Sequence, residues 1–329
     1  MSKRNDRMIR VIELLADGNF HSGQTIGEEI GVSRTAISQY IKDVQALGLD
    51  VFRITGKGYK LSQAIELLEL NAIETALAPN SSIPVHLERI VTSTNDVMRE
   101  RLQMGGEFEA GEVLLAEAQT AGRGRRGKQW YSPFATNLYL SMYWPLRQGM
   151  SAAMGLSIVI GVLLAEAVRE AGVTGVTLKW PNDVLVDNKK LAGILIDLEG
   201  QVIDDAHAII GVGVNLSMPE WLAMPIDQAW TDLESELSKK LNRNAWVANL
   251  IARFRAGLQD FDSQGLEPFI QRWLQLDDLL NRNVTLTMGN RKINGVAKGI
   301  AEDGALCVEI EGAVKHFHAG EVSLRYDTN

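Results

Sequence analysis

The residues that most directly indicate chemistry form one short loop, from Gly122 to Lys128, which reads GRGRRGK. Its sequence matches the dinucleotide-binding pattern G-x-G-x-x-G, whose glycines let a pyrophosphate reach the N-terminus of the following helix. Here Pro133 would interrupt such a helix, and the apolar residues after it alternate as in a strand. The P-loop pattern also fails, because Gln129 lacks the hydroxyl that binds Mg²⁺. The three arginines and the exposed amides instead predict a flexible loop that closes over a multiply charged anion.

Further short motifs accompany this loop in one order along the chain. They are Ser93-Thr94-Asn95, Gln119, Lys179-Trp180-Pro181-Asn182-Asp183, Lys190-Leu191-Ala192-Gly193-Ile194-Leu195 and Gly211-Val212-Gly213-Val214-Asn215. The set resembles the biotin–protein ligases over most of residues 66 to 270. Residues 1 to 65 resemble the DNA-binding domain of the bifunctional members, which repress biotin synthesis.

This resemblance implies a two-step reaction. The biotin carboxylate attacks ATP, and an acceptor lysine of biotin carboxyl carrier protein then attacks biotinyl-5′-AMP. ATP and biotin are therefore expected as substrates, and Mg²⁺ is expected to bind together with ATP. No residue is assigned as a metal ligand. In bifunctional members the adenylate is also the corepressor, because its ordering of flexible loops promotes homodimerisation and operator DNA binding.

The first step brings two anions together, so cations and backbone amides must surround them. The ureido ring of biotin is neutral and needs hydrogen-bond donors and acceptors instead. In the family, residues that match Ser93, Thr94, Asn95, Gln119, Arg123, Gly124, Arg125 and Lys190 line the biotin and adenylate site. Arg125 and Lys190 are predicted to be catalytic and to hold the carboxylate and the phosphate. Trp130 is predicted to stack beside the adenylate, and Gly193 and Gly211 to let the backbone approach it.

Each of these residues also has a structural interpretation. Ser93 and Thr94 are typical caps of a following helix, and arginines in a loop usually form a solvated face. Lys190 follows a probable turn at Asp187-Asn188 and has the alternative of being an ordinary turn lysine. The joint occurrence of the motifs makes so many independent coincidences improbable.

Other residues are interpreted as structural or stay open. Trp180 and Pro181 are interpreted as structural, because proline ends a strand and tryptophan packs there. The roles of Lys179 and Asp183 stay open, and one carboxylate is weak evidence for an Mg²⁺ site. His316 and His318 share one face of a predicted strand, but two histidines alone do not define a metal site.

Three other functions compete with this interpretation. A lipoate–protein ligase shares the central fold, but the DNA-binding head and the arginine loop favour biotin. A ligand-responsive repressor without catalysis would keep the pocket and form no adenylate. A nicotinamide-dependent enzyme is disfavoured by the loop itself, as argued above.

Composition sets broader bounds. The chain has 329 residues, 46% of them hydrophobic, a net charge of −8 and one cysteine, Cys307. These values predict a folded protein of two or three domains without an internal disulfide, and a net negative charge disfavours indiscriminate coating of nucleic acid. The charged N-terminus lacks an apolar signal segment, and the longest apolar run, residues 152 to 165, is shorter than the roughly 20 residues of a spanning helix. We therefore expect a cytoplasmic protein with no membrane partner.

The first 65 residues predict a winged helix-turn-helix. Helical spacing from Met8 to Leu15 is followed by helices capped by Ser22 and Ser33, and by two short strands around Thr55-Gly56-Lys57-Gly58. Between Gly31 and Leu61, five basic residues face two acidic ones. Polar and basic side chains of the third helix and the wing are predicted to contact DNA: Arg34, Thr35, Ser38, Gln39, Lys42 and Lys57. A protein-interaction module is the alternative.

The rest of the chain predicts a mixed α/β domain and then short strands, an overall fold class of α/β (α+β). Strands are expected at 85–91, 113–118, 137–144, 176–180, 184–186, 194–198 and 208–214, and helices at 66–77, 94–103, 151–171, 245–261 and 266–276. Turns at Gly289-Asn290, Asp303-Gly304 and Glu311-Gly312 indicate a small β-barrel, which the family has in SH3-like form. The expected domains are a winged helix-turn-helix (1–65), a ligase catalytic domain (66–270) and an SH3-like domain (271–329).

Overall fold

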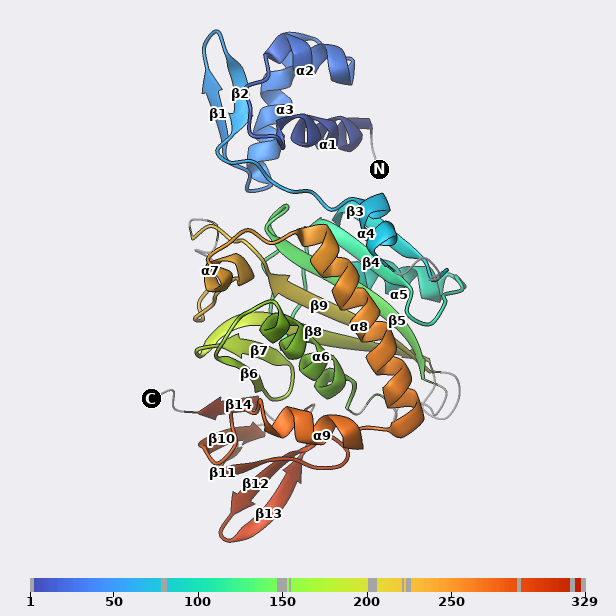
Figure 1. Cartoon of the computed structure of the whole chain (residues 1–329), viewed down its shortest axis with the longest axis vertical. Helices are drawn as coiled ribbons and strands as arrows, with labels where there is room; N and C mark the ends of the chain where they lie inside the picture. Colours follow the sequence, from blue (N-terminus) through green and yellow to red (C-terminus); the bar gives the residue numbers. More distant parts are fainter. Residues whose placement is uncertain are drawn as a thin grey trace.

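The computed structural model describes residues 3–77, 82–146, 153, 155–200, 206–220, 222, 226–288, 291–319 and 323–326, the last of these in their backbone only. Three bodies follow one another along the long axis of the molecule (Figure 1). A small helical domain lies at one end, a large sheet with helices in the middle, and a small sheet at the other end. The predicted turn at Gly289-Asn290, the loop predicted from residue 78 and the helix start at Ser151 lie outside the described residues.

The N-terminal domain is the predicted winged helix-turn-helix. Its elements are α1 (Lys3–Leu15), α2 (Gly23–Ile30), α3 (Arg34–Ala46), β1 (Val51–Ile54) and β2 (Gly58–Leu61). The Ser22 hydroxyl accepts from the Thr25 amide at 3.0 Å, and Gly31 ends α2 with φ 66°, a value that favours glycine. Ser33 precedes α3, but its side chain makes no capping hydrogen bond, so that detail of the prediction is wrong.

The segment that leaves this domain differs from the prediction. Helix α4 spans only Leu70–Ala76, whereas the sequence predicted a helix from Glu66. The Leu68 amide donates to Glu117 Oε1 at 2.5 Å, and the Glu69 amide donates to Asn244 Oδ1 at 2.7 Å. Because these distant side chains take the amides that a helix would leave at its N-terminus, the segment stays extended up to Glu69.

The central sheet is mixed, as predicted. In the described residues its strands run in the order β3-β4-β5-β9-β8-β7-β6, with β3 parallel to β4 and every other neighbour antiparallel. The strands are β3 (Val85–Val91), β4 (Val113–Gln119), β5 (Asn137–Leu146), β6 (Val176–Lys179), β7 (Asp183–Val186), β8 (Lys189–Gly200) and β9 (Ala206–Asn215). Strand β8 begins five residues before the predicted start, because Asp187 and Asn188, with φ 46° and 65°, form a tight turn that pairs Val186 with Lys189.

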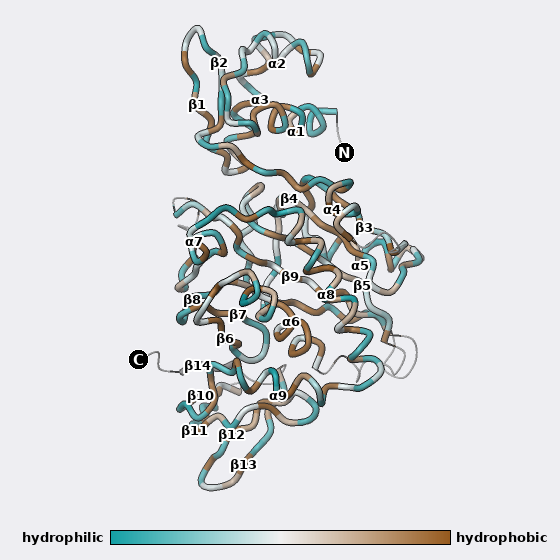
Figure 2. Tube along the Cα trace, viewed as in Figure 1, coloured by the Kyte–Doolittle hydropathy of each residue, from teal (hydrophilic) through white to brown (hydrophobic). Residues whose placement is uncertain are grey.

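Helices cover both faces of this sheet. Helix α5 (Thr94–Gln103) packs Met98 with Tyr143 and Ile209 on one face. Helices α6 (Leu156–Glu170) and α8 (Arg243–Gln264) lie on the other face, where the main core is (Figure 1). Helix α6 is buried on nearly every side, and its trace is mostly hydrophobic in colour (Figure 2). The helix predicted at 151–171 is thus confirmed for its described part. Within the described residues, no helix is both long and apolar enough to cross a membrane.

Three smaller pieces complete the chain. The GRGRRGK loop contains a single 3₁₀ turn, Arg125–Gly127, and α7 (Leu233–Leu237) was not predicted. Helix α9 (Glu267–Leu274) leads to an antiparallel sheet of five described strands in the order β13-β12-β11-β10-β14. These are β10 (Asn283–Met288), β11 (Arg291–Ile300), β12 (Leu306–Ile310), β13 (Ala313–Phe317) and β14 (Ser323–Tyr326). Gly304 and Gly312 adopt φ 81° at the turns predicted for them.

The N-terminal domain rests on the central sheet through a small apolar contact. Phe134, which follows the GRGRRGK loop, is buried in the same cluster as Ile12 and Ile37 of the helical domain. Its amide donates to Leu47 O at 3.4 Å, and Arg89 reaches Glu13 at 3.4 Å. The segment between the loop and β5 therefore also contacts the N-terminal domain.

Candidate functional site

A cavity of about 420 Å³ opens on the face of the central sheet that carries α5. The GRGRRGK loop, the turn between β6 and β7, and residues 226–230 surround it. All residues that the sequence predicted for biotin and adenylate binding line this cavity, namely Ser93, Thr94, Asn95, Gln119, Arg123, Gly124, Arg125, Trp130, Lys190, Gly193 and Gly211. The fold thus brings together residues separated by more than a hundred positions in the sequence.

One end of the cavity is neutral and strongly hydrogen-bonded, and we call it the polar end. It consists of the lining residues Thr94, Asn95 and Gln119, together with Ser132 and Ser141, which bond to them. Gln119 Oε1 accepts from the Thr94 amide at 2.8 Å, and Gln119 Nε2 donates to Ser132 Oγ at 3.0 Å. Ser141 Oγ donates to Asn95 Oδ1 at 2.5 Å and lies 2.7 Å from Thr94 Oγ1. Since Thr94, Asn95 and Ser141 are buried, this end presents fixed donors and acceptors without net charge.

The helix-cap interpretation of Ser93 fails for its side chain. Ser93 occupies the residue before α5 and is buried, but its hydroxyl makes no capping hydrogen bond. The amide of Thr94 is instead taken by Gln119, a residue of β4. The first turn of α5 is therefore tied to the wall of the cavity.

Glycines make room for two of the lining side chains. A Cβ at Gly211 would lie 2.5 Å from Asn95 Oδ1, and a Cβ at Gly213 would lie 2.5 Å from the indole of Trp130. Both distances are too short for real side chains, so β9 can carry only glycine beneath Asn95 and Trp130. The packing of Asn95 thus requires glycine at position 211, independently of the predicted approach of the backbone to a ligand.

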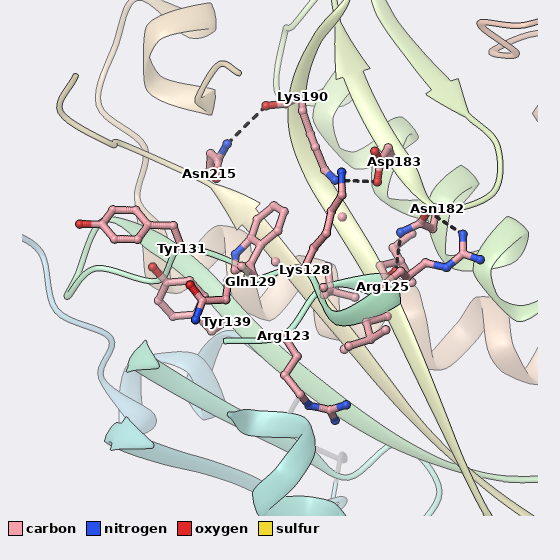
Figure 3. Close-up of a pocket in the computed structure, with 18 of the residues that line it drawn as sticks. Arg123, Arg125, Lys128, Gln129, Tyr131, Tyr139, Asn182, Asp183, Lys190 and Asn215 are labelled. Atoms are coloured by element: carbon pink, nitrogen blue, oxygen red, sulfur yellow. Dashed lines mark hydrogen bonds and ion pairs between the residues drawn. The ribbon is translucent and has the colours of Figure 1, made fainter. Parts of the chain in front are cut away.

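The opposite end, which we call the cationic end (Arg125, Lys128, Lys179 and Lys190), gathers positive charge (Figure 3). Lys190 Nζ lies 2.8 Å from Asp183 Oδ1 and 5.4 Å from the centre of the Trp130 ring. Arg125 donates to Asn182 Oδ1 at 3.1 Å and to the carbonyl of Ala319 at 2.6 Å, both of them neutral oxygens. Burial lowers the pKa of Arg125 and of Lys179, which indicates that water alone does not solvate these cations.

A β-bulge aims Lys190 into the cavity. Asp183 pairs with Gly193 and Val184 with Ala192, but Leu185 pairs with Lys190, so Leu191 is an extra residue in β8. Bulges of this kind redirect side chains beside functional sites. Lys190 therefore shares the cavity face with Gly193, whose Cβ would lie 3.3 Å from Lys190 Cε, and it is a strand residue rather than a turn lysine.

Arg123 lies in the lining but points away from the Lys190–Asp183 pair (Figure 3). Its guanidinium forms ion pairs with Asp96 at 2.9 Å and with Asp197. Two carboxylates thus compensate its charge in this state, in contrast to the neutral partners of Arg125.

Sequence reasoning missed several lining residues. Asn182 and Lys179 belong to a motif of the sequence, but no role was predicted for them. Ser132 and Ser141, which support the lining residues Gln119, Thr94 and Asn95 by hydrogen bonds, belong to no motif. Trp230 reaches the cavity because residues 229 to 231 bond to the backbone of Lys190. No pattern in the sequence indicated that contact, since it joins a loop to a strand about forty residues away.

Two residues interpreted from the sequence as structural or left open, Trp180 and His318, have polar partners. Trp180 is buried and donates through Nε1 to the Gly304 carbonyl at 3.0 Å. His318 Nε2 lies 3.0 Å from Asp303 Oδ2. The pKa of Asp303 is lowered mainly by a hydrogen bond from the Ala305 amide and, to a smaller extent, by the hydrogen bond with His318. No group of three or more metal-ligating side chains is found in the described part of the chain.

The predicted DNA-binding residues lie on one exposed region of the N-terminal domain. Ile37, Ile41 and Val44 of α3 are buried, which leaves the opposite face free. The exposed residues are Arg34, Thr35, Ser38, Gln39 and Lys42 on α3 and Lys57 at the wing tip. Such a face has the residue types and the exposure that major-groove contact requires.

Comparisons with known proteins agree with this architecture. Residues 7–60 match the HTH domain, residues 87–215 the biotin/lipoate A/B protein ligase family, and residues 279–325 the biotin protein ligase C terminal domain. The chain is 44% identical over 317 residues to the bifunctional ligase/repressor BirA of Salmonella typhimurium, covering 96% of this chain and 97% of that protein. It belongs to the BirA family of bifunctional biotin ligases and repressors.

A second BirA and a solved structure extend the comparison. BirA of Escherichia coli is 43% identical over 323 residues, which cover 98% of each chain. The structure of a biotin protein ligase from Aquifex aeolicus in complex with biotin and ATP matches with a TM-score of 0.62 and 27% identity. It covers 74% of this chain, and 99% of the Aquifex chain is matched. The BirA-type fold class predicted from the sequence is thereby confirmed, and ligase and repressor functions belong to one chain.

Proposed function

We propose that this BirA-type protein forms biotinyl-5′-AMP from biotin and ATP and transfers biotin to a lysine of biotin carboxyl carrier protein. The observation that carries the proposal is the division of one cavity into the neutral polar end and the cationic end, with Trp130 between them. Biotin has the same division, because a neutral ureido ring and a carboxylate lie at its two ends. The ring fits the polar end, and the carboxylate then reaches the cations that receive the triphosphate.

In the first step a carboxylate oxygen of biotin attacks the α-phosphorus of ATP, and pyrophosphate leaves. Lys190 and Arg125 hold the two reacting anions close together and stabilise the negative charge that develops on the phosphate. Arg125 suits this role because its guanidinium is partly desolvated and donates its hydrogen bonds to neutral oxygens of Asn182 and Ala319. Lys190 would exchange its contact with Asp183 for one with the ligand.

The lining of this site fits an Mg²⁺ ion bound together with ATP. The carboxylates among the cavity-lining residues are Asp183 and Asp227. Mg²⁺ commonly takes one or two carboxylates and completes its shell with phosphate oxygens and water. When bound, the ion would neutralise charge on the departing pyrophosphate.

In the second step the amine of the acceptor lysine attacks the carbonyl of the mixed anhydride and AMP leaves. The cavity must stay closed over the adenylate until the carrier protein arrives, because the anhydride reacts with other amines and with water. The GRGRRGK loop provides this closure through Arg123, Gly124 and Arg125.

The adenylate also serves as the corepressor in this proposal. The ligand-bound protein forms a homodimer, and its paired winged helix-turn-helix domains bind the operator of biotin synthesis genes through the exposed face of α3 and through Lys57. The protein works in the cytoplasm. Its three domains are residues 1–65, 66–270 and 271–329, with α9 spanning the last border.

The test is a ligation assay with the purified protein, ATP, carrier protein, and either labelled biotin or labelled lipoate. Label transfer from biotin with release of pyrophosphate supports the proposal. Transfer from lipoate instead would make the protein a lipoate ligase. Biotin-dependent operator binding without pyrophosphate release would reduce it to a repressor without catalysis.

A further inference from the structure

Helix α5 and strand β8 are joined by a row of polar contacts that starts at the cavity. Asn95 Nδ2 donates to Asp197 Oδ2 at 3.1 Å, and Gln103 Nε2 donates to Glu199 Oε2 at 3.2 Å. Between them, Arg99 Nε lies 3.9 Å from Glu199 Oε1. One helical turn rises by about 5.4 Å and two strand residues span about 6.6 Å, so the step from Asn95 to Arg99 on α5 matches the step from Asp197 to Glu199 on β8. Gln103, one turn further on, shares Glu199 with Arg99.

The first contact of this row fixes the amide of Asn95 completely. Its Nδ2 group donates one hydrogen to the Leu195 carbonyl at 3.2 Å and the other to Asp197, while Oδ1 accepts from Ser141. An asparagine amide has only two donor hydrogens. Asn95 therefore has no hydrogen left for a ligand, and only the second lone pair of Oδ1 is available as an acceptor.

Asp197 has a second partner at the same oxygen. Arg123 Nη2 contacts Asp197 Oδ2, and it also lies 2.9 Å from Asp96 Oδ1. The Asp96 carboxylate is shared in turn with Arg99 at 2.6 Å. The side chains of Asp96 and Asp197 are each 17% exposed, so these charges are only partly screened by water.

We propose that Asp197 is a positioning residue for biotin, a role that rests on the proposed function of the cavity. Its carboxylate orients the Asn95 amide so that Oδ1 faces the cavity and accepts a ureido N–H. The same carboxylate holds Arg123 away from the cationic end, and Arg123 thereby anchors the GRGRRGK loop to α5 and β8. Arg125 then meets the reacting anions, and Arg123 keeps the loop in place.

The decisive experiment measures biotin binding by calorimetry without ATP, and the KM for ATP in adenylate formation. Asp197→Ala removes the acceptor that orients Asn95, so biotin binding should weaken about tenfold, as expected for loss of a hydrogen bond to a charged group. The KM for ATP should change by less than about twofold, because Arg123 keeps Asp96 as a partner.

Two variants separate the two partners of Asp197. Asp197→Asn keeps an acceptor oxygen for Asn95 and removes the charge, so it should restore biotin affinity to within about threefold of wild type. Asp96→Asn is the matched control, because it weakens the anchoring of Arg123 without touching Asn95. Its biotin affinity without ATP should equal that of wild type within about twofold.

A double-mutant cycle distinguishes orientation from general loss of structure. If Asp197 acts through Asn95, the variant Asn95→Ala with Asp197→Ala should bind biotin no more weakly than Asn95→Ala alone. Additive losses, or wild-type affinity in Asp197→Ala, would overturn the inference while leaving the proposed function intact. Failure of the wild-type protein to bind biotin would overturn both.

Discussion

The two ends of the cavity are built on different principles. The side chains of the polar end come from one helix, two strands and the buried Ser132, and they bond to one another before any ligand arrives. At the cationic end, Arg125 and Lys128 lie on the GRGRRGK loop, whereas Lys179 and Lys190 lie in β6 and β8. Arg125 contacts neutral oxygens, and Lys190 contacts a single carboxylate. A neutral ring can be recognised only by well-placed dipoles, so that end is rigid. Anions are recognised by charge, which tolerates movement, so the other end can open and close.

The largest effect is expected at the cationic end. Lys190→Ala should slow adenylate formation by at least about a hundredfold, because it removes a cation beside both reacting anions. Pyrophosphate release in single turnover measures this step. Lys189→Ala is the matched control, since Lys189 is the exposed neighbour in β8, and it should leave the rate unchanged. A normal rate in Lys190→Ala would mean that charge at this end does not drive the reaction.

The loop provides the next largest effect. Arg125→Gly removes charge-assisted hydrogen bonds and loosens the backbone, so preformed adenylate should dissociate about tenfold faster or more. Escaped adenylate should then label bystander lysines, and ligand-linked dimerisation should weaken. Arg126→Gly is the comparison variant. It removes an exposed arginine of the same loop at a φ of 57°, a value that favours glycine, and it should change release less. If release and dimerisation both stayed at wild-type values, the loop would be only a solvated turn.

The polar end is tested by overpacking rather than by charge. Gly211→Ala places a Cβ 2.5 Å from Asn95 Oδ1 and must displace that amide, so the KM for biotin should rise about tenfold. The rate at saturating biotin should fall much less, because the cations are untouched. Gly161→Ala is the control, as its Cβ would approach no atom closer than 3.5 Å. An unchanged KM for biotin would show that this end does not bind the ring.

The smallest effect concerns a surface distant from the cavity. Arg34→Ala or Lys57→Ala should weaken operator binding and reduce the slope of log affinity against log salt by about one, which is the loss of one phosphate contact. Ligation should stay nearly intact, because both residues are exposed on the N-terminal domain. Equal loss of ligation would contradict a separation of the two activities.

The sequence by itself determined most of the elements and a large part of the cavity lining. Periodicity and capping residues are local, so α2, α5 and the wing strands were predicted within a residue or two of their observed bounds. The motifs containing Arg125, Lys190 and Asn95 also identified residues that line one cavity. The local sequence was sufficient for these predictions, because they depend only on residue type and spacing.

Only the tertiary structure decided which way the side chains of the site point and which groups they contact. Helix α4 begins only at Leu70, because Glu117 and Asn244 take the amides of Leu68 and Glu69. Lys190 faces the cavity because of a bulge at Leu191. Arg123 and Arg125 lie in one loop, yet Asp96 and Asp197 form ion pairs with Arg123, whereas Arg125 donates to neutral oxygens. Each of these outcomes depends on groups brought together from distant positions, and no local pattern contains that information.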